Sequence, residues 1–381
     1  MNVLNTVKAF GCHDIVQLDE EPSPRHLEYL DLLKVSGQKS LKVNAVAEFQ
    51  SRPLLYIVSN DQIRDIDNNR RLDFQCLLAN RGERAYLGIL SPGELNVYPV
   101  NLDRSVLVNS RKRTIKKNSP EAPLFFQSVV NGVFNLEGQP EAPDHVFKTI
   151  VDLMTKSSNA LIDPKTYNLN PMDVLSFLGR ALFFRFLWDR KIVRLSELPS
   201  VCPKAKLLED CFRNVENSVE TCRWLDETFN GDLLPFSSSY TDVFRQADEQ
   251  TGGKLFLHLL AILKGWKYAG IEAFQQQIDW GDLDFEHIPI GVLSQVYENF
   301  IKIWDPQQRE QTSAYYTPKN IARYLVDDAF EGVTDKKNAR ILDPSCGAGI
   351  FLVLAFRKLV AARWEHDGKR PDTKAIQSHS L

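Results

Sequence analysis

The fold of the C-terminal part of the chain is decided by Ser313-Ala-Tyr-Tyr-Thr-Pro318 and, after an amphipathic run, Arg340-Ile-Leu-Asp-Pro-Ser-Cys-Gly-Ala-Gly-Ile-Phe-Leu352. Ile341-Leu342 predicts a buried strand, Asp343-Gly349 a tight loop, and Ile350 the start of a helix. Open α/β sheets bind ligands where a strand ends in such a loop before a helix. The helix N-terminus offers free N–H groups to an anionic ligand group. The sequence therefore predicts a small-molecule site.

Two cofactor classes compete for this loop. A dinucleotide fingerprint needs a third glycine, where this chain has Leu352, and an acidic residue at the end of a second strand about 20 residues on. Glu365 lies near that distance, but the pattern places it in a continuing helix. A small-molecule oxidoreductase is therefore a weaker alternative, which a titration with a nicotinamide dinucleotide would test.

A family resemblance favours the other cofactor. Asp343-Pro-Ser-Cys-Gly-Ala-Gly-Ile-Phe-Leu352 resembles the S-adenosylmethionine loop of adenine-N6 DNA methyltransferases, and Tyr315-Tyr-Thr-Pro318 resembles the motif that closes over the methionine end of that cofactor. Leu178–Arg190, Phe229–Phe236 and Ile288–Phe300 look like the helical segment ahead of the methyltransferase domain in large type II-like restriction–modification proteins. The resemblance runs over residues 170–370 and is vague before residue 145.

The resemblance implies S-adenosyl-L-methionine as cofactor. Asp343 would accept hydrogen bonds from its ammonium group, a charge-assisted contact. Thr317 as N-cap and Pro318 at the first position would start a helix from Asn320 to Ala329, and this capping role explains both residues without a cofactor as well. The implied cofactor-binding residues are Tyr316, Thr317, Pro318, Asp343, Pro344, Ser345, Gly347, Gly349 and Phe351.

Composition sets wide bounds. The chain has 381 residues, 43% hydrophobic and 25% charged, as in ordinary soluble proteins, and its net charge of −3 gives no global signature of nucleic-acid binding. The N-terminus shows no secretory pattern, so we expect a cytoplasmic protein. The six cysteines lack metal-pair spacing, which predicts reduced thiols and no metal site. Cys346 is expected to be a small packed residue, not a covalent nucleophile.

Three domains are expected. Residues 1–143 read as an α/β domain, in the position where some restriction–modification enzymes carry a nuclease. Strands are expected at Val43–Phe49 and Leu54–Val58, joined by a turn at Gln50–Pro53, followed by a helix and a hairpin. A nuclease site needs carboxylates on adjacent strands plus a lysine, and Glu48 lacks that lysine two residues later, so no active nuclease is expected.

The other two domains follow this one. Pro120–Pro143 looks like a linker, residues 144–310 read as a helical domain, and residues 311–381 read as the first strand, loop and helix of a Rossmann-like methyltransferase domain. The fold class is therefore α/β and α. In the helix that begins near Pro171, the closely spaced aromatic residues are expected in the core.

The basic run Arg111-Lys-Arg-Thr-Ile-Lys-Lys117 has two interpretations. Five positive charges in seven residues could bind the phosphates of double-stranded DNA without reading its sequence. The alternative is a solvated loop with no partner. Because the chain as a whole is not basic, any DNA contact has to be local.

One expected motif is absent. Adenine-N6 transfer requires a flipped-out base, and in this family an Asn/Asp-Pro-Pro-Tyr/Phe motif accepts hydrogen bonds from its amino group. No such motif occurs here: Asn170-Pro171 is followed by Met172 and is expected to cap a helix. The catalytic residues are therefore expected outside this chain.

The sequence stops at Leu381, before the second strand that a doubly wound sheet requires. We expect the N-terminal piece of a site-specific DNA adenine-N6 methyltransferase of a restriction–modification system, inactive alone or dependent on a separate chain that carries the rest of the domain. The alternative is a non-catalytic DNA-binding or specificity module that works with a separate catalytic chain.

Overall fold

The protein was analysed as a computed structural model that describes residues 3–19, 21–33, 42–62, 68–140, 145–229, 234–264, 267–268, 274–275, 283–289, 291–292, 296, 317, 319–346 and 349–372. The chain forms two compact units. The sheet unit contains residues 1–79, 83–143 and 313–381, and the helical unit contains residues 80–82 and 144–312. The division into three domains stays a prediction. No described helix is long and apolar enough to cross a membrane.

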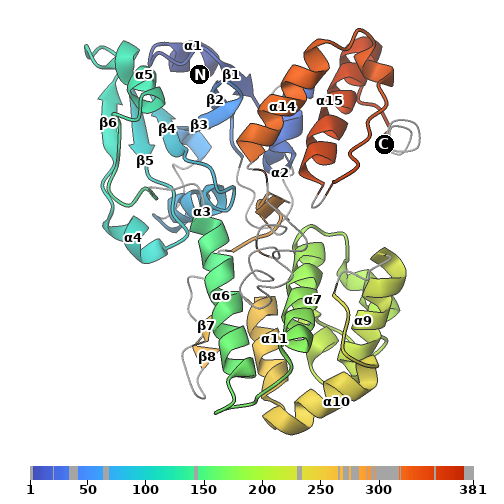
Figure 1. The fold of residues 1–381 in the computed structure, drawn as a ribbon. Coiled ribbons are helices and arrows are strands. Elements are labelled where there is room, and N and C mark those ends of the chain that lie inside the picture. Colours follow the sequence, from blue (N-terminus) through green and yellow to red (C-terminus); the bar gives the residue numbers. More distant parts are fainter. Residues whose placement is uncertain are drawn as a thin grey trace. The chain divides into compact units, whose positions relative to one another are not determined.

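The sheet unit is built on a six-stranded sheet whose spatial order follows the chain (Figure 1). Its strands are β1 (Ile15–Gln17), β2 (Ala45–Phe49), β3 (Arg52–Ser59), β4 (Tyr86–Ser91), β5 (Glu94–Tyr98) and β6 (Arg113–Lys116). Neighbouring strands are antiparallel except β3 and β4, which are parallel. A parallel pair needs a crossover, and α3 (Asn68–Ala79) supplies it. The structure is thus mixed α/β, as predicted.

The expected hairpin of β2 and β3 is confirmed, with a shorter turn. Gln50 and Ser51 alone form it, with φ angles of 51° and 59°. Positive φ at both central residues is the type I′ geometry that fits the twist of a hairpin. Pro53, expected in the turn, lies in β3 opposite Glu48, next to a register shift. A proline cannot donate to the ladder and is tolerated at such an irregularity.

Short helices complete the N-terminal part of this unit. They are α1 (Val3–Lys8), η1 (Pro24–Tyr29), α2 (Leu30–Leu33), η2 (Asn60–Gln62), α4 (Arg104–Asn109), η3 (Ala122–Leu124) and α5 (Phe125–Val130). Phe125, Phe126 and Val129 of α5 pack into the same core as Leu55 and Tyr86 of the sheet. The prediction of a linker over Pro120–Pro143 was therefore wrong, because two adjacent buried phenylalanines make this segment part of the core.

Two helices from the end of the chain belong to the same unit. They are α14 (Lys319–Glu331) and α15 (Ile350–Asp367), with η7 (Lys336–Asn338) between them. They lie side by side in Figure 1 and share a core. Ala322, Val326 and Phe330 repeat every four residues on α14 and pack against a stripe of α15 that includes Leu354 and Leu359. This spacing places one apolar face of each helix against the other.

The helical unit contains α6 (His145–Ile162), α7 (Pro171–Asp189), η4 (Leu195–Glu197), α8 (Leu198–Val201), η5 (Leu208–Phe212), α9 (Val215–Phe229), α10 (Tyr240–Thr251), α11 (Lys254–Lys264), β7 (Lys267–Tyr268) and β8 (Phe274–Gln275). Asn170 caps α7 as predicted: its Oδ1 accepts from the Met172 N–H at 2.8 Å. Of the aromatic residues expected in the core, Phe184 and Phe186 are buried, whereas Phe183 and Trp188 are only half-buried. Most of residues 290–304 lie outside the described residues.

Buried arginines hold the helical unit together. Arg180 of α7 is 5% exposed, donates to Asp226 Oδ1 at 2.7 Å and to the Leu234 carbonyl at 2.9 Å, and lies over the Phe236 ring. Its pKa stays raised, because these contacts outweigh the effect of burial, which alone would lower it. Arg185 donates to Asp189 Oδ2 at 2.8 Å and to the Leu263 carbonyl at 2.6 Å. Both charges are thus satisfied inside the core.

Candidate functional site

The candidate site is the loop between the two C-terminal helices. The helix expected from Ile350 is confirmed as α15, which runs through Glu365 to Asp367. The helix expected from Asn320 to Ala329 is confirmed as α14. The two helices hold the ends of the intervening loop through their shared core. The position of the loop is therefore fixed by packing on both sides.

The strand expected at Ile341-Leu342 is not present. Both residues have irregular backbone, and Leu342 is 86% exposed. A strand is stable only when a neighbour takes up its backbone hydrogen bonds, and no strand lies beside this segment in the described part of the chain. Ile341 does contact the core of α14 and α15. The apolar residues alone were not sufficient to form the strand.

Asp343 is the polar centre of the loop. Its Oδ1 accepts from the backbone N–H of Ser345 at 3.1 Å, a tight local turn. Its Oδ2 is buried and has no hydrogen-bond partner among the described residues. A buried carboxylate oxygen without a donor is costly. Asp343 Oδ2 therefore retains the capacity to accept a hydrogen bond.

Gly349 forms the junction between loop and helix. It is the N-cap of α15, with φ +74°, a left-handed conformation that L side chains rarely adopt. Its N–H donates to the Cys346 carbonyl at 2.7 Å, and its carbonyl accepts from Val353 N–H at 2.9 Å. The first turn of α15 is thereby fixed directly after the loop. Cys346, expected to be packed, is exposed because this turn directs it outward.

The other predicted binding residues are only partly described. Thr317 is half-buried, and Pro344 and Ser345 are exposed beside Asp343. Phe351 is half-buried and packs against the core of α14 and α15, which gives it a structural role at least. Tyr316, Pro318 and Gly347 lie outside the described residues. The binding role of all nine residues stays a prediction.

Glu48, weighed as a nuclease carboxylate, is already engaged. It is 6% exposed on β2, where it accepts from the Tyr29 hydroxyl and pairs with Arg25 at 2.8 Å. Burial and this acidic surrounding raise the pKa of Tyr29, so its hydroxyl stays a donor. The carboxylate thus has partners from the protein itself.

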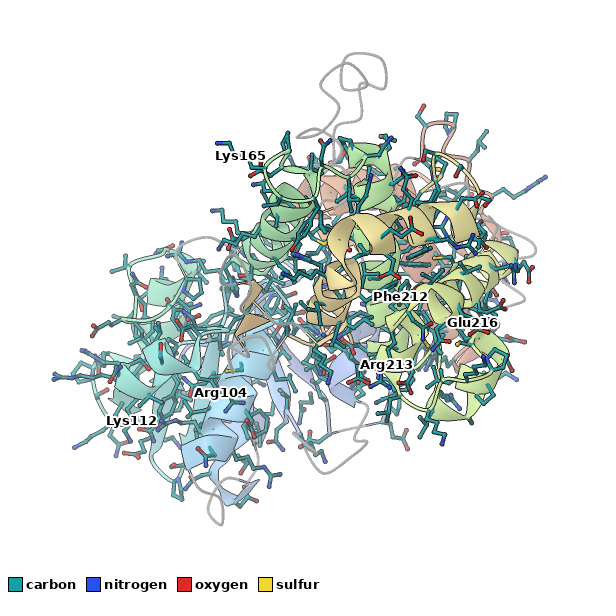
Figure 2. The ribbon with its side chains drawn as sticks, turned by 90° about the horizontal axis from the view of Figure 1, so that it is seen from below. Arg104, Lys112, Lys165, Phe212, Arg213 and Glu216 are labelled. Carbon is teal, nitrogen blue, oxygen red and sulfur yellow. The ribbon has the colours of Figure 1, made fainter. Side chains whose placement is uncertain are left out.

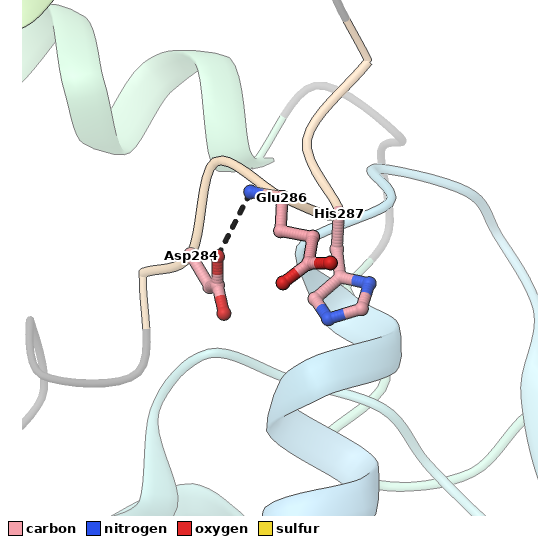
Figure 3. Close-up of side chains that lie close together, drawn as sticks. All are labelled: Asp284, Glu286 and His287. Atoms are coloured by element: carbon pink, nitrogen blue, oxygen red, sulfur yellow. Dashed lines mark hydrogen bonds between the residues drawn. The ribbon is translucent and has the colours of Figure 1, made fainter. Parts of the chain in front are cut away.

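Sequence reasoning missed one group in the helical unit. One ligand atom each of Asp284, Glu286 and His287 lies within 4.8 Å of the others (Figure 3). Asp284 Oδ1 accepts from Glu286 N–H at 2.8 Å, and Lys191 Nζ lies 3.1 Å from Glu286 Oε2. The lysine already compensates one carboxylate. The only sequence signal for this group was that Asp284, Glu286 and His287 lie within four positions. Acidic residues and histidines this close in sequence are common on protein surfaces, so the spacing alone does not indicate a metal site.

Comparisons with known proteins agree with the position of this loop. The sequence model of the N-6 DNA methylase family matches residues 289–376, which include both motifs. The type I restriction enzyme MjaIX methylase subunit of Methanocaldococcus jannaschii is 34% identical over 74 residues, which are 19% of this chain and 12% of the relative. This chain therefore spans a small part of that relative's length.

Among solved structures, a chain of the cryoEM structure of a DrdV–DNA complex aligns with 97% of this chain and 36% of its own length. The sequence identity is 13% and the TM-score is 0.29. The fold is therefore described from the structure of this chain alone, without support from the DrdV complex. The family match and the methylase relative confirm the resemblance drawn from the two motifs to an N6-adenine DNA methyltransferase of a restriction–modification system. The similarity to the N-6 DNA methylase family is thus to residues 289–376 of this chain.

Proposed function

We propose that this chain contributes the S-adenosylmethionine-binding start of a site-specific DNA adenine-N6 methyltransferase in a restriction–modification system. The observation that carries the proposal is Asp343, whose buried Oδ2 lacks a partner among the described residues within a segment that matches the N-6 DNA methylase family. A primary ammonium group is the kind of donor that this oxygen lacks.

The loop residues would divide the work of holding the cofactor. Asp343 would accept hydrogen bonds from the ammonium group, and the N–H groups at the start of α15 would face an anionic group. Tyr316, Thr317 and Pro318 would close over the methionine end. The bound cofactor supplies an electrophilic methyl group. No Asn/Asp-Pro-Pro-Tyr/Phe motif occurs in residues 1–381, so these residues would contribute cofactor binding and not the groups that hold the flipped adenine.

Calorimetric titration of the purified chain tests cofactor binding. Asp343→Asn keeps the shape of the side chain and removes its charge, so we expect S-adenosylmethionine affinity to fall about ten-fold or more, because a hydrogen bond to a charged group contributes roughly 1.5–3 kcal/mol. Asp335→Asn, an exposed carboxylate between the same helices, is the matched control. Absence of binding by the wild type, or binding of a nicotinamide dinucleotide in its place, would refute the proposal.

A second candidate function, a DNA-binding module, is favoured by the basic run. Arg113–Lys116 of this run form β6, an edge strand of the sheet, and Arg111, Lys112 and Lys117 flank it outside the strand. Arg111, Lys112, Lys116 and Lys117 are exposed, and Arg113 pairs with Glu121 at 3.1 Å. Lys112 extends away from the ribbon in Figure 2. Such a row of charges fits a phosphate backbone, but lysines also protect free sheet edges from pairing.

The salt dependence of DNA binding separates these roles. Replacing Lys112, Lys116 and Lys117 by serine should reduce the slope of log affinity against log salt by up to about 0.9 for each phosphate that the variant no longer neutralises. Lys165→Ser with Lys206→Ser, exposed lysines of the helical unit, serves as control. An unchanged slope together with new aggregation would show that the lysines only protect the edge of the sheet.

A further inference from the structure

Glu28 connects the two C-terminal helices to the N-terminal part of the sheet unit. It lies on η1, and its Oε2 is 2.8 Å from Arg323 of α14, 2.8 Å from Arg357 of α15 and 3.7 Å from Lys319 of α14. The Glu28 side chain is 27% exposed. Arg357 is 329 positions away in sequence, so only the tertiary fold brings these groups together.

The charges around Glu28 are unequal. Burial would raise the pKa of Glu28, but Lys319, Arg357 and Arg323 together lower it to about 2, so the group is ionised. Burial also lowers the pKa of Lys319, as do the two arginines, while Glu28 and Glu83 raise it. Without the Glu28 charge, three like charges would face one another at short range, which is unfavourable. Glu28 is therefore required to keep these cations together.

The position of each cation matters as much as its charge. Lys319 is the first residue of α14, two residues after Thr317, and Arg323 follows one turn later, where it also donates to the Ser51 carbonyl at 2.7 Å. Arg357 lies on α15, two turns after Gly349. One carboxylate thus contacts both helices that follow the two cofactor motifs.

We propose that Glu28 is a positioning residue for the cofactor site, which fixes the starts of α14 and α15 relative to each other so that Thr317 and Asp343 can act on one ligand. This inference rests on the proposed function. Leu27 of η1 shares the apolar core of α14 and α15, and Glu28 adds charged contacts at the first turn of α14, where Lys319 and Arg323 lie. The N-terminal part of the sheet unit thereby takes part in cofactor binding.

The purified full chain provides the test, with Glu28→Gln as the main variant. Its affinity for S-adenosylmethionine should fall about ten-fold, within the usual range for coupling between sites. Amide hydrogen exchange over residues 319–323 should become faster, while residues 326–331 keep the wild-type rate. Arg357→Gln leaves Glu28 paired with Arg323 and should lose less affinity. Asp327→Asn is the control, because Lys358 and Asp327 pair at 2.6 Å between the same two helices.

The outcomes are distinguishable. Failure of the wild type to bind S-adenosylmethionine overturns the proposed function, and this inference with it. Wild-type binding with unchanged affinity in Glu28→Gln overturns only the role of Glu28. Equal losses of S-adenosylmethionine affinity in Glu28→Gln and Asp327→Asn, with a lowered melting temperature in both, would show that the ion pairs only stabilise the fold. This result would also overturn the positioning role of Glu28.

Discussion

Replacement of Gly349 by alanine tests whether the junction of loop and helix has the described geometry. A Cβ built at this residue meets no atom of the described residues within 4 Å, so the substitution creates no clash with them. The cost comes only from the left-handed backbone, with φ +74°, and should be roughly 1–2 kcal/mol. For a unit of about 200 residues, this corresponds to a melting temperature lower by ~2–8 °C.

Gly332, directly after α14, is a matched control. A Cβ there also meets open space, and its φ lies outside the left-handed region. Alanine at that position should be neutral or stabilise by about 0.4–1 kcal/mol, since it reduces the freedom of the unfolded chain. Differential scanning calorimetry of both variants provides the comparison. Equal melting temperatures for Gly349→Ala and the wild type, or equal losses in both variants, would refute the assigned backbone at the loop.

Three further predictions concern the rest of the chain. Burial lowers the pKa of His258 to about 4, so the unfolding free energy of the helical unit should fall as pH drops from 6.5 to 4, by at most about 3 kcal/mol, and His258→Gln should flatten this dependence in thermal melts at pH 4.5 and 7. Gln50→Asn with Ser51→Gly should raise stability by about 1 kcal/mol in urea titrations, because both residues have positive φ. Arg180→Met should cost ~3–5 kcal/mol in the same titrations, and more than Asp226→Asn, because it removes the donor to both Asp226 Oδ1 and the Leu234 carbonyl and leaves Asp226 only its hydrogen bond from Tyr240. A smaller loss for Arg180→Met than for Asp226→Asn would contradict the assigned network.

Several elements could be predicted from the sequence because their causes are local. The Asn170-Pro171 pair caps α7 through contacts within two residues, and a turn between β2 and β3 was expected at Gln50–Pro53, although only Gln50 and Ser51 form it. The two cofactor motifs were recognised in the same way, and the family match covers both. The residues expected to bind the cofactor lie close together in these two short segments, so they could be recognised without the structure.

Other features were decided by packing. The prediction of a strand at Ile341-Leu342 was wrong although both residues favour strands. A strand needs a neighbouring strand for its backbone hydrogen bonds, and a local sequence pattern does not show whether one is present. Pro120–Pro143 looked like a linker, yet Phe125 and Phe126 bury in the core of the sheet. The composition of a segment indicates the backbone conformation that it favours in isolation. The free energy gained by burying aromatic side chains can outweigh that local preference.

Helices α14 and α15, the glycine at the start of α15 and the carboxylate in the loop could be identified from short segments of sequence. Each of these depends on hydrogen bonds and dihedral angles of residues a few positions apart. Packing of distant segments is what buries Asp343 Oδ2 without a partner among the described residues and brings Glu28 to Arg323 and Arg357. Ion pairs over hundreds of positions depend on sheet order and helix packing, which fix where distant segments meet.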